Sequence, residues 1–336
     1  MPEILAEVYR NQLVESRHRG NVVLVNNEGE LRGKVGDENT VTYWRSAAKP
    51  LQALPVIFSG AADRYGFTDK ELAVMAASHN GEDRHTAAVN SILEKIDLPE
   101  SALDCGIHPP LHKETANRLR AEGEKPRQIH NNCSGKHAGI LTLCRFYNWP
   151  FENYILPDHP SQKLWLKVIA EITDFSEEKI YTGEDGCGVV VFGLPLRNMA
   201  YAYARLANPE TLPGKYRKAA VKITSVMEEN PEMVAGESRF DTDLMRVLGN
   251  RLFAKSGAEG VFSLGIHGGC GITIKIEDGR SRAIPAVVTN LLTQLNLMGE
   301  KELDELQKYY NPVIENHHQH QVGRIVAKFN LKERGI

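Results

Sequence analysis

The amino-acid sequence predicts an α+β protein in which both ends of the chain form an antiparallel sheet and the middle forms a helical lobe. Short apolar runs bounded by turn residues occur in the first 45 residues and again after residue 260, and such runs are typical of strands. From residue 50 to about residue 161 apolar side chains recur at helical spacing instead, as Leu51, Leu54 and Phe58 do. Strands at both ends with helices between them favour one sheet with an added helical layer.

The individual elements follow from local patterns. VVLVN (22–26), the turn NNEG and LRGKV (31–35) predict a β-hairpin. VFSLGI (261–266) and GITIKIEDGR (271–280) predict adjacent antiparallel strands, and QVGRIVAKFNL (321–331) predicts one more. Helices are expected at DKELAVMAASHNG, closed by Asn80-Gly81, at SQKLWLKVIAEIT, at residues 241–253 with Asp241 or Thr242 as N-cap, and at AIPAVVTNLLTQLNLMG.

Length and pattern indicate how these elements are grouped. A chain of 336 residues can form one large domain or two closely joined lobes. We expect a single unit over residues 1–336, with an α/β lobe from residues 1–48 and 258–336 and a mainly helical lobe from residues 49–257.

Composition limits the class of protein. The chain is 42% hydrophobic and 25% charged, which is typical of a globular protein, and its net charge of −3 argues against a nucleic-acid partner. The start MPEILAEVYRNQ is acidic where a signal peptide is basic, and no apolar run is long enough to cross a membrane. Five scattered cysteines without a C-x-x-C pair favour buried thiols in a reducing compartment. We therefore expect a cytoplasmic protein.

Three short motifs point to nucleophilic chemistry. They are S-x-x-K (Ser46 to Lys49), S-x-N (Ser78 to Asn80) and K-S-G starting at Lys255, in the order that marks serine β-lactamases and penicillin-binding proteins. A serine hydroxyl needs an adjacent base, and a lysine can serve if desolvation or a second cation lowers its pKa. Lys49 would be that base and Lys255 the second cation.

The remaining parts of such a site can be placed as well. Ser78 would pass a proton to the leaving nitrogen, and the backbone N–H groups of Ser46 and Ala258 would form the oxyanion hole. Each motif alone has an ordinary explanation, since Ser46 and Lys49 can simply begin a helix and K-S-G can be a turn. Pro50 directly after the lysine indicates the first turn of a helix, where free backbone N–H groups can bind an anion.

A second cluster surrounds NNCSGKHAG, which holds Cys133, Lys136 and His137, and GEDGCG, which holds Asp185 and Cys187. A glycine-rich helix entry with buried cysteines explains these residues without any function. A metal site is an alternative, because cysteine, histidine and carboxylate are zinc ligands, although the spacing fits no standard zinc motif. A catalytic Cys133 thiol with His137 is a third reading.

Long blocks of the sequence resemble one family. RSAAKPLQALP, ASHNGEDRHTAAV, CGIHPP, NNCSGKHAGIL, GEDGCGVVVFGLPL, NPEMVAGESRFDTDLM and AKSGAEGVFSLGI together resemble the rhizobial-type (class 3, thermolabile) L-asparaginase II family, from about residue 7 to residue 326. The resemblance implies a serine β-lactamase/glutaminase-like fold, a homodimer, and hydrolysis of L-asparagine to L-aspartate and ammonia through an acyl-enzyme.

The resemblance also assigns roles to residues. It implies two Ser-Lys pairs, Ser46 with Lys49 and Ser78 with Lys255. It implies a zinc site at Cys133, Lys136 and Cys187, and positions close to the substrate or to the zinc ligands for Asp185, His137 and Asn80. The tract with His317, His318 and His320 does not belong to the family pattern; we expect a solvated loop or edge strand there, with metal binding as the alternative.

Three other functions stay open on sequence alone. A glutaminase differs by one methylene in its substrate, which a pocket distinguishes only weakly. A β-lactamase acts outside the cytoplasm, which conflicts with the expected location. A non-catalytic asparagine-binding protein on the same fold would not need two lysines beside serines.

Overall fold

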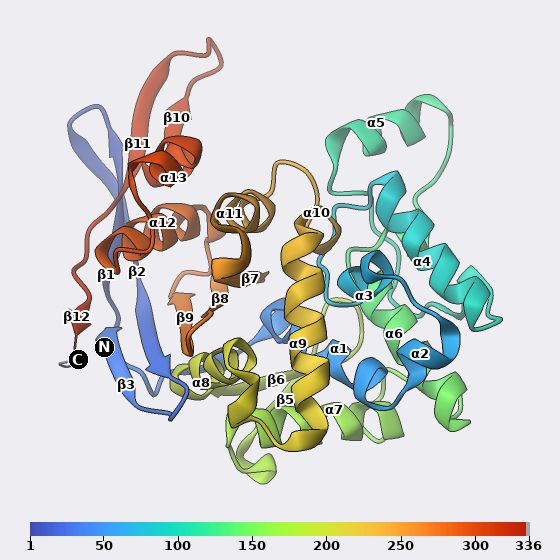
Figure 1. The fold of residues 1–336 in the computed structure, drawn as a ribbon. Helices are drawn as coiled ribbons and strands as arrows, with labels where there is room; N and C mark the ends of the chain where they lie inside the picture. Colours follow the sequence, from blue (N-terminus) through green and yellow to red (C-terminus); the bar gives the residue numbers. More distant parts are fainter. Residues whose placement is uncertain (334–336) are drawn as a thin grey trace. The chain divides into compact units, whose positions relative to one another are not determined.

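The strands from both ends of the chain form one antiparallel sheet in the computed structural model, which describes residues 1–333 (Figure 1). Its main path runs β10-β11-β1-β2-β9-β8-β7, and β3 joins β2 to β12. The strands are β1 (Glu3–Arg10), β2 (Leu13–Asn26), β3 (Leu31–Val35), β7 (Leu252–Gly257), β8 (Val261–Ile266), β9 (Cys270–Ile276), β10 (Val313–Glu315), β11 (Gln321–Ala327) and β12 (Lys332–Glu333). The predicted α+β class with a sheet from both termini is confirmed.

The chain divides into two units, each described by itself. The sheet unit comprises Met1–Thr42, Leu194–Asn208 and the chain from Asp243 onward. The helical unit comprises Tyr43–Gly193 and Pro209–Thr242.

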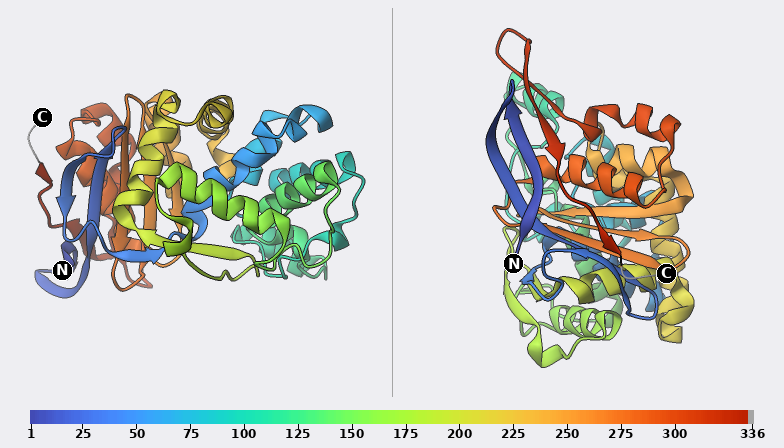
Figure 2. Two further views of the ribbon diagram at one scale, coloured as in Figure 1. Left: turned by 90° about the horizontal axis from the view of Figure 1, so that it is seen from below. Right: turned by 90° about the vertical axis from the view of Figure 1, so that its left-hand side faces the viewer.

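The middle of the sheet is buried on both faces. All six residues of β8 are buried, and the predicted hairpin of β2 with β3 and the predicted pair β8 with β9 both form. Helix α8 (Leu196–Ala207) packs on β2, β8 and β9, whereas α12 (Ile284–Gln294) packs on β1 and β11. Figure 2 shows these two helices on opposite faces of the sheet.

A glycine allows α8 to approach the sheet closely. A Cβ atom at Gly271 of β9 would lie 1.9 Å from the Ala200 carbonyl oxygen and 2.4 Å from the Ala204 backbone nitrogen. Both are backbone atoms of α8, which cannot move aside as a flexible side chain can. Only glycine therefore permits this helix–sheet distance.

Helix α6 (Ser134–Tyr147) forms the centre of the helical unit. Its residues from Ser134 to Cys144 are all buried, and it contacts α1, α3, α4 and α7. Close contact with α3 requires Gly135, where a Cβ would lie 2.1 Å from the Val74 carbonyl oxygen. The surrounding helices are α1 (Lys49–Phe58), α2 (Ala61–Tyr65), α3 (Asp69–Met75), α4 (Asp83–Lys95), α5 (Lys113–Ala121), α7 (Pro160–Thr173), α9 (Gly214–Glu229) and α10 (Pro231–Val234).

The remaining elements complete the chain. A small ladder pairs β5 (Tyr181–Glu184) with β6 (Val190–Pro195), and β4 (Val41–Tyr43) precedes the S-x-x-K motif. The other helices are α11 (Phe240–Leu248), α13 (Glu300–Glu305) and α14 (Gln307–Tyr310). No helix within residues 1–333 is both long and apolar enough to span a lipid bilayer.

Two local predictions differ from the structure. The helix expected over residues 69–81 ends at Met75, because the Ser78 N–H donates to the Val234 carbonyl and the His79 N–H to the Asn132 carbonyl instead of bonding within a helix. The helix expected at 241–253 is α11, which begins at Phe240 and ends at Leu248. The K-S-G motif forms the end of β7 and directly precedes the turn to β8.

Candidate active site

Backbone geometry places Lys49 at the start of a helix. Residues Arg45–Ala48 form one 3₁₀ turn, and α1 begins at Lys49 with Pro50 in its first turn, as the sequence predicts. Arg45 has a left-handed φ of 54°, which is costly for a residue other than glycine. This strained turn directs the chain from β4 into the helix.

The Lys49 side chain contacts two other segments of the chain, 77–78 and the start of α6 at Cys133. It is buried and donates hydrogen bonds to the Ala77 carbonyl oxygen at 2.6 Å, to Ser78 Oγ at 3.0 Å and to Cys133 Sγ at 3.2 Å. Ser46 Oγ makes no hydrogen bond to any residue in the described range, 1–333, and Ser46 is half-buried. Of the two candidate serines, Ser78 is therefore the one whose hydroxyl contacts Lys49.

His79 anchors the segment that carries Ser78. The Gly81 N–H donates to His79 Nδ1 at 3.1 Å, and His79 Nε2 bonds to Ser134 Oγ at 2.9 Å. Because the Ser134 hydroxyl donates to the Ile129 carbonyl, His79 Nε2 is the donor to Ser134. Burial and the nearby His85 and Lys49 hold the pKa of His79 well below its usual value, so the ring is neutral. His79 thus ties the Ser78 segment to the start of α6.

The Asn80 side chain is hydrogen-bonded to the loop that carries Glu237 and Arg239. Its Oδ1 accepts from Arg239 Nη1 at 2.9 Å, while its Nδ2 donates to the Glu237 carbonyl at 3.2 Å and to Glu82 Oε1 at 3.3 Å. All polar atoms of this side chain are therefore already paired within the helical unit.

Two thiols and an amine converge beside Lys49. Lys136 Nζ lies 3.0 Å from Cys187 Sγ, and the Cys133 thiol donates to Asn132 Oδ1 at 3.2 Å. The interaction of the two thiols, together with the charge of Lys136, lowers the pKa of Cys187 to about 5, and the same interaction with burial raises the pKa of Cys133 to about 12. Burial opposes the charge of Lys136, but the two sulfur atoms and Asp185 outweigh it and raise its pKa. These pKa directions favour the thiolate form of Cys187 beside the Lys136 ammonium group.

Asp185 connects this cluster to the S-x-x-K turn. Its Oδ1 accepts from Arg45 Nε at 3.0 Å and from Arg45 Nη2 at 2.8 Å. Burial would raise the pKa of this carboxyl, but the charges of Lys136 and Arg45 dominate and lower it. A carboxylate therefore holds the strained Arg45 turn next to the thiol cluster.

His137 presents an unused donor. The Tyr154 hydroxyl accepts from the Asp104 N–H and lies 2.7 Å from His137 Nδ1, so the hydroxyl proton is directed to Nδ1 and the ring proton resides on Nε2. Nε2 is buried and has no hydrogen-bond partner within residues 1–333. Burial, with Lys136 adding to it, lowers the pKa of this ring to about 3. A buried N–H without an acceptor suits an oxygen of a bound molecule.

The donor set formed by Cys133, Lys136 and Cys187 fits a thiophilic metal such as zinc. Two sulfur atoms and one nitrogen meet in a buried place, where cysteine is a common zinc ligand and lysine a rare one. Binding would require the Cys133 thiol and the Lys136 ammonium to lose their protons. Over residues 1–333, no group of three or more His, Cys, Asp or Glu side chains is arranged to hold a metal, so lysine is needed to complete the set.

The third motif lies in the sheet unit. Lys255 is on β7, where its ammonium donates to the Ser256 carbonyl at 2.8 Å, and Ala258 follows the end of that strand. The pairing of Ser78 with Lys255 and the oxyanion role of Ala258 therefore stay predictions. The His317–His320 tract lies in the exposed turn between β10 and β11, where Asn316 Oδ1 accepts the backbone N–H groups of His318 and His320.

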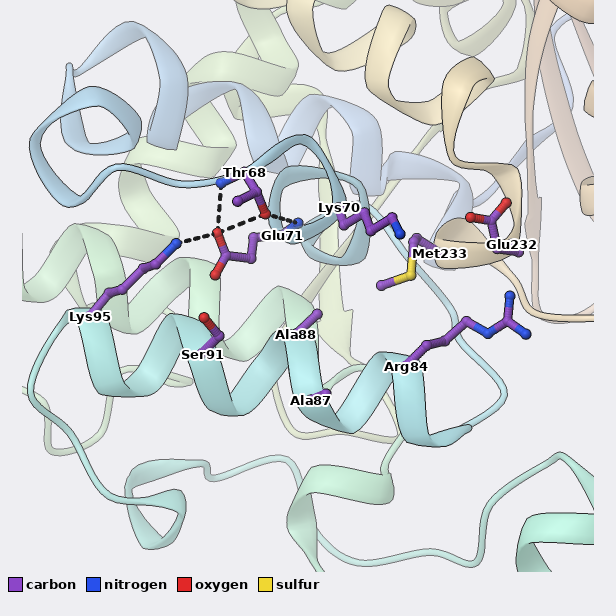
Figure 3. Close-up of a pocket in the computed structure, with 10 residues that line it drawn as sticks. All are labelled: Thr68, Lys70, Glu71, Arg84, Ala87, Ala88, Ser91, Lys95, Glu232 and Met233. Atoms are coloured by element: carbon purple, nitrogen blue, oxygen red, sulfur yellow. Dashed lines mark hydrogen bonds and ion pairs between the residues drawn. The ribbon is translucent and has the colours of Figure 1, made fainter.

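A separate pocket of about 490 Å³ lies between α3, α4 and α10 (Figure 3). Its interior holds an ion pair, in which Lys95 Nζ is 2.6 Å from Glu71 Oε2, and Arg84 lies at its other end. None of the predicted site residues lines it.

Sequence reasoning missed several residues of the site. Arg45 and His79 lie inside the motifs that were recognised, but nothing in the sequence reveals a left-handed φ or a bond to Ser134. Arg239 lies in a block used only for the resemblance. The contact of Lys49 with Cys133 spans 84 residues and has no local signal.

Comparison with known families decides the assignment. A family model described as L-asparaginase II matches residues 6–327. The chain belongs to the L-asparaginase II family. This confirms the resemblance read from the sequence blocks, and membership in the L-asparaginase II family supports an amidohydrolase.

Solved structures resemble this L-asparaginase II family member at low identity. A structure of Mglu is 15% identical over 83% of this chain and 67% of that chain, with a TM-score of 0.37. A β-lactamase from Mycobacterium bovis is 14% identical over 82% of this chain and 94% of that chain, with a TM-score of 0.43. A Bacillus glutaminase is 13% identical over 83% and 91%, with a TM-score of 0.35.

The chain spans 62% to 67% of the length of the Mglu chains that it matches. A search among curated proteins found no match. Because every TM-score is below 0.5, the fold assignment rests on the strands and helices described above.

Proposed function

We propose that this protein hydrolyses L-asparagine to L-aspartate and ammonia through a serine–lysine acyl-enzyme. One observation carries the proposal beyond family membership: the buried Lys49 amine lies 3.0 Å from the Ser78 hydroxyl oxygen. A hydroxyl within hydrogen-bond reach of a lysine is the arrangement that a serine nucleophile and its base require.

The proposed reaction has two halves. Lys49 donates three hydrogen bonds as an ammonium group, so it must first release one proton to act as the base. The neutral amine then takes the hydroxyl proton of the attacking serine, the serine oxygen bonds to the side-chain amide carbon, and the C–N bond breaks as the proton passes to the leaving nitrogen to form ammonia. Water then attacks the ester, Lys49 takes a proton from it, and the serine recovers its own proton as aspartate leaves. The His137 Nε2–H is available to donate to a substrate oxygen during these steps.

Two serines compete for the nucleophilic role. The sequence favoured Ser46 with Lys49 as its base, whereas the 3.0 Å contact favours Ser78 as the hydroxyl that Lys49 deprotonates. Ser46 Oγ keeps its hydrogen-bonding capacity for the substrate or for proton transfer. Mass spectrometry of a trapped acyl-enzyme identifies the serine that carries the acyl group.

We also propose that Cys133, Lys136 and Cys187 hold zinc. When bound, the metal would supply a positive charge that recognises the α-amino or α-carboxylate group of the substrate. Lys136 and Cys133 would release protons on binding, so metal affinity should rise with pH. If protein freed of metal by EDTA kept its affinity for asparagine, this role would be wrong.

One assay tests the whole proposal. Ammonia release from L-asparagine and from L-glutamine is measured for the wild type, Ser46→Ala and Ser78→Ala, with and without chelator. The two substrates differ by one methylene, which a pocket distinguishes by roughly 10- to 200-fold. Equal or better turnover of glutamine would make the protein a glutaminase, and binding of asparagine without ammonia release would make it a non-catalytic binding protein.

The homodimer and the cytoplasmic location implied by the sequence also stay proposals. Sedimentation velocity at several protein concentrations measures the oligomeric state directly.

A further inference from the structure

We infer that Arg239 binds the α-carboxylate of the amino-acid substrate in a cavity beside the S-x-N segment. The inference rests on the proposed asparaginase function and names a residue that determines specificity at the same site. The cavity has a volume of about 590 Å³ and is lined within the helical unit by Asn80, Leu111, His112, Lys113, Glu114, Glu237, Ser238 and Arg239.

The Arg239 guanidinium group has donors to spare. Its Nη1 donates to Asn80 Oδ1 at 2.9 Å. Among residues 1–333, no carboxylate lies within ion-pair distance of it, whereas Arg84 on the neighbouring α4 contacts Glu82 at 3.1 Å and Glu237 at 3.2 Å. A guanidinium group presents five N–H donors that match a carboxylate in a two-point contact. Arg239 is therefore equipped to bind a carboxylate from outside the protein.

The loop that carries Arg239 is held in a strained conformation. Ser238 has a left-handed φ of 59°, and Gly236 has a φ of 117°. A Cβ at Gly236 would lie 2.5 Å from both Asn80 Nδ2 and Glu82 Oε1, and the Glu237 N–H donates to Glu82 Oε1 at 2.9 Å. Strain that neighbouring contacts maintain is common at binding sites. Here it positions Arg239 against Asn80.

The position of Asn80 relates this cavity to the proposed nucleophile. The N–H groups of Ser78 and His79 bond to two different segments, at Val234 and Asn132, as in an extended strand. On such a backbone alternate side chains share a face, so Ser78 and Asn80 lie on one side while His79 points to Ser134. Side chains two residues apart are separated by about 7 Å. An amino acid held by Arg239 beside Asn80 would therefore extend along this segment toward Ser78, which does not itself line the cavity.

The lining also indicates which amino acids fit. It carries both signs of charge, since Lys113 lies beside Glu114, and Glu237 is paired with Arg84, so the lining is suited to a zwitterionic amino acid. If Arg239 binds the α-carboxylate, the α-amino group of the substrate would be the group that the proposed metal site recognises.

The test compares two substrates that differ only at the α-carboxyl group. Ammonia release is measured from L-asparagine and from L-asparagine methyl ester, which has no α-carboxylate and whose amide is its only source of ammonia. For Arg239→Gln we expect KM for asparagine to rise about 10- to 100-fold with little change in kcat, because a charged hydrogen bond is lost. KM for the methyl ester should stay unchanged. Arg239→Lys should restore part of the loss. Arg120→Gln, at an exposed arginine of α5 whose Nη1 donates to Asn117, is the matched control and should change neither KM.

An equal loss on both substrates, or an unchanged KM for asparagine, would overturn the role of Arg239. If the wild type released no ammonia from asparagine, the proposed function would fail instead. Calorimetric binding of L-asparagine and L-aspartate would then test Arg239 separately: weaker binding by Arg239→Gln than by Arg120→Gln supports the inference, and equal binding refutes it.

Discussion

Replacing Lys49 with methionine tests the centre of the proposed site. Methionine nearly matches the length and volume of lysine, so the cavity that it leaves is small. The change removes the donor to the Ala77 carbonyl, Ser78 Oγ and Cys133 Sγ. A buried acceptor left without its donor costs about 1–3 kcal/mol, and the loss of a buried ammonium group offsets part of that cost. The free energy of unfolding should therefore fall by no more than about 3 kcal/mol.

The effect of Lys49→Met on turnover should be much larger. A positioned base contributes about 10²- to 10⁴-fold to the rate, which equals about 3–5 kcal/mol of transition-state stabilisation. Ammonia release measures kcat, and urea unfolding confirms that the variant is folded. Lys70→Met, at an exposed lysine of α3, is the control and should behave as the wild type. A folded Lys49→Met variant that keeps more than a tenth of wild-type kcat would refute the role of Lys49 as base.

Two further predictions concern stability. Burial would raise the pKa of Glu71, but hydrogen bonds from Lys95, Ser91 and Thr68 prevail and lower it. The Glu71 carboxylate therefore stabilises the folded protein above the unfolded pKa near 4.5. This contribution is lost as the pH falls through the lower pKa of the folded state. In urea unfolding, Glu71→Gln should have a lower free energy of unfolding than the wild type at pH 7, and this free energy should fall less as the pH is lowered. If the free energy of unfolding depended on pH in the same way for both proteins, the ion pair in Figure 3 would be contradicted. Gly271→Ala should lose about 1–3 kcal/mol or more, because its Cβ meets the backbone of α8 at 1.9 Å. The matched control is Gly214→Ala, where a Cβ meets nothing within 4 Å, and it should change stability by less than about 1 kcal/mol.

Local patterns predicted the sheet well because they reflect burial along a single segment. The hairpin at 22–35, the strands at 261–276 and the last long strand all form where alternation and turn residues indicated them. The end of α3 could not be predicted in the same way. AASHNG contains no signal that Ser78 and His79 bond to Val234 and Asn132, which are distant in sequence.

The sequence named residues that lie together within the helical unit, but it did not predict which of them contact each other. The motifs named Ser46, Lys49, Ser78 and the two cysteines, yet the S-x-x-K motif suggested Ser46 as the partner of Lys49. In the structure Ser46 lies in a 3₁₀ turn before α1, and Lys49 extends to Ser78. Pairing depends on how α1, α3 and α6 pack, and three segments far apart in sequence determine it together. A single sequence holds no record of that packing.

The order of strands in the sheet also concerns synthesis of the chain on the ribosome. Strands near the start of the chain pair with strands near its end: β2 pairs with β9, and β1 pairs with β11, where Ala6 lies opposite Ala327. At about 5–20 residues per second, the apolar VVLVN segment waits about 12 to 50 s for β9 to be translated. We expect the nascent N-terminal hairpin to need a chaperone during that interval. Protease protection of the hairpin in ribosome-stalled chains should rise only once β9 and β11 have emerged, so translation rate and chaperone supply would set the yield of folded protein.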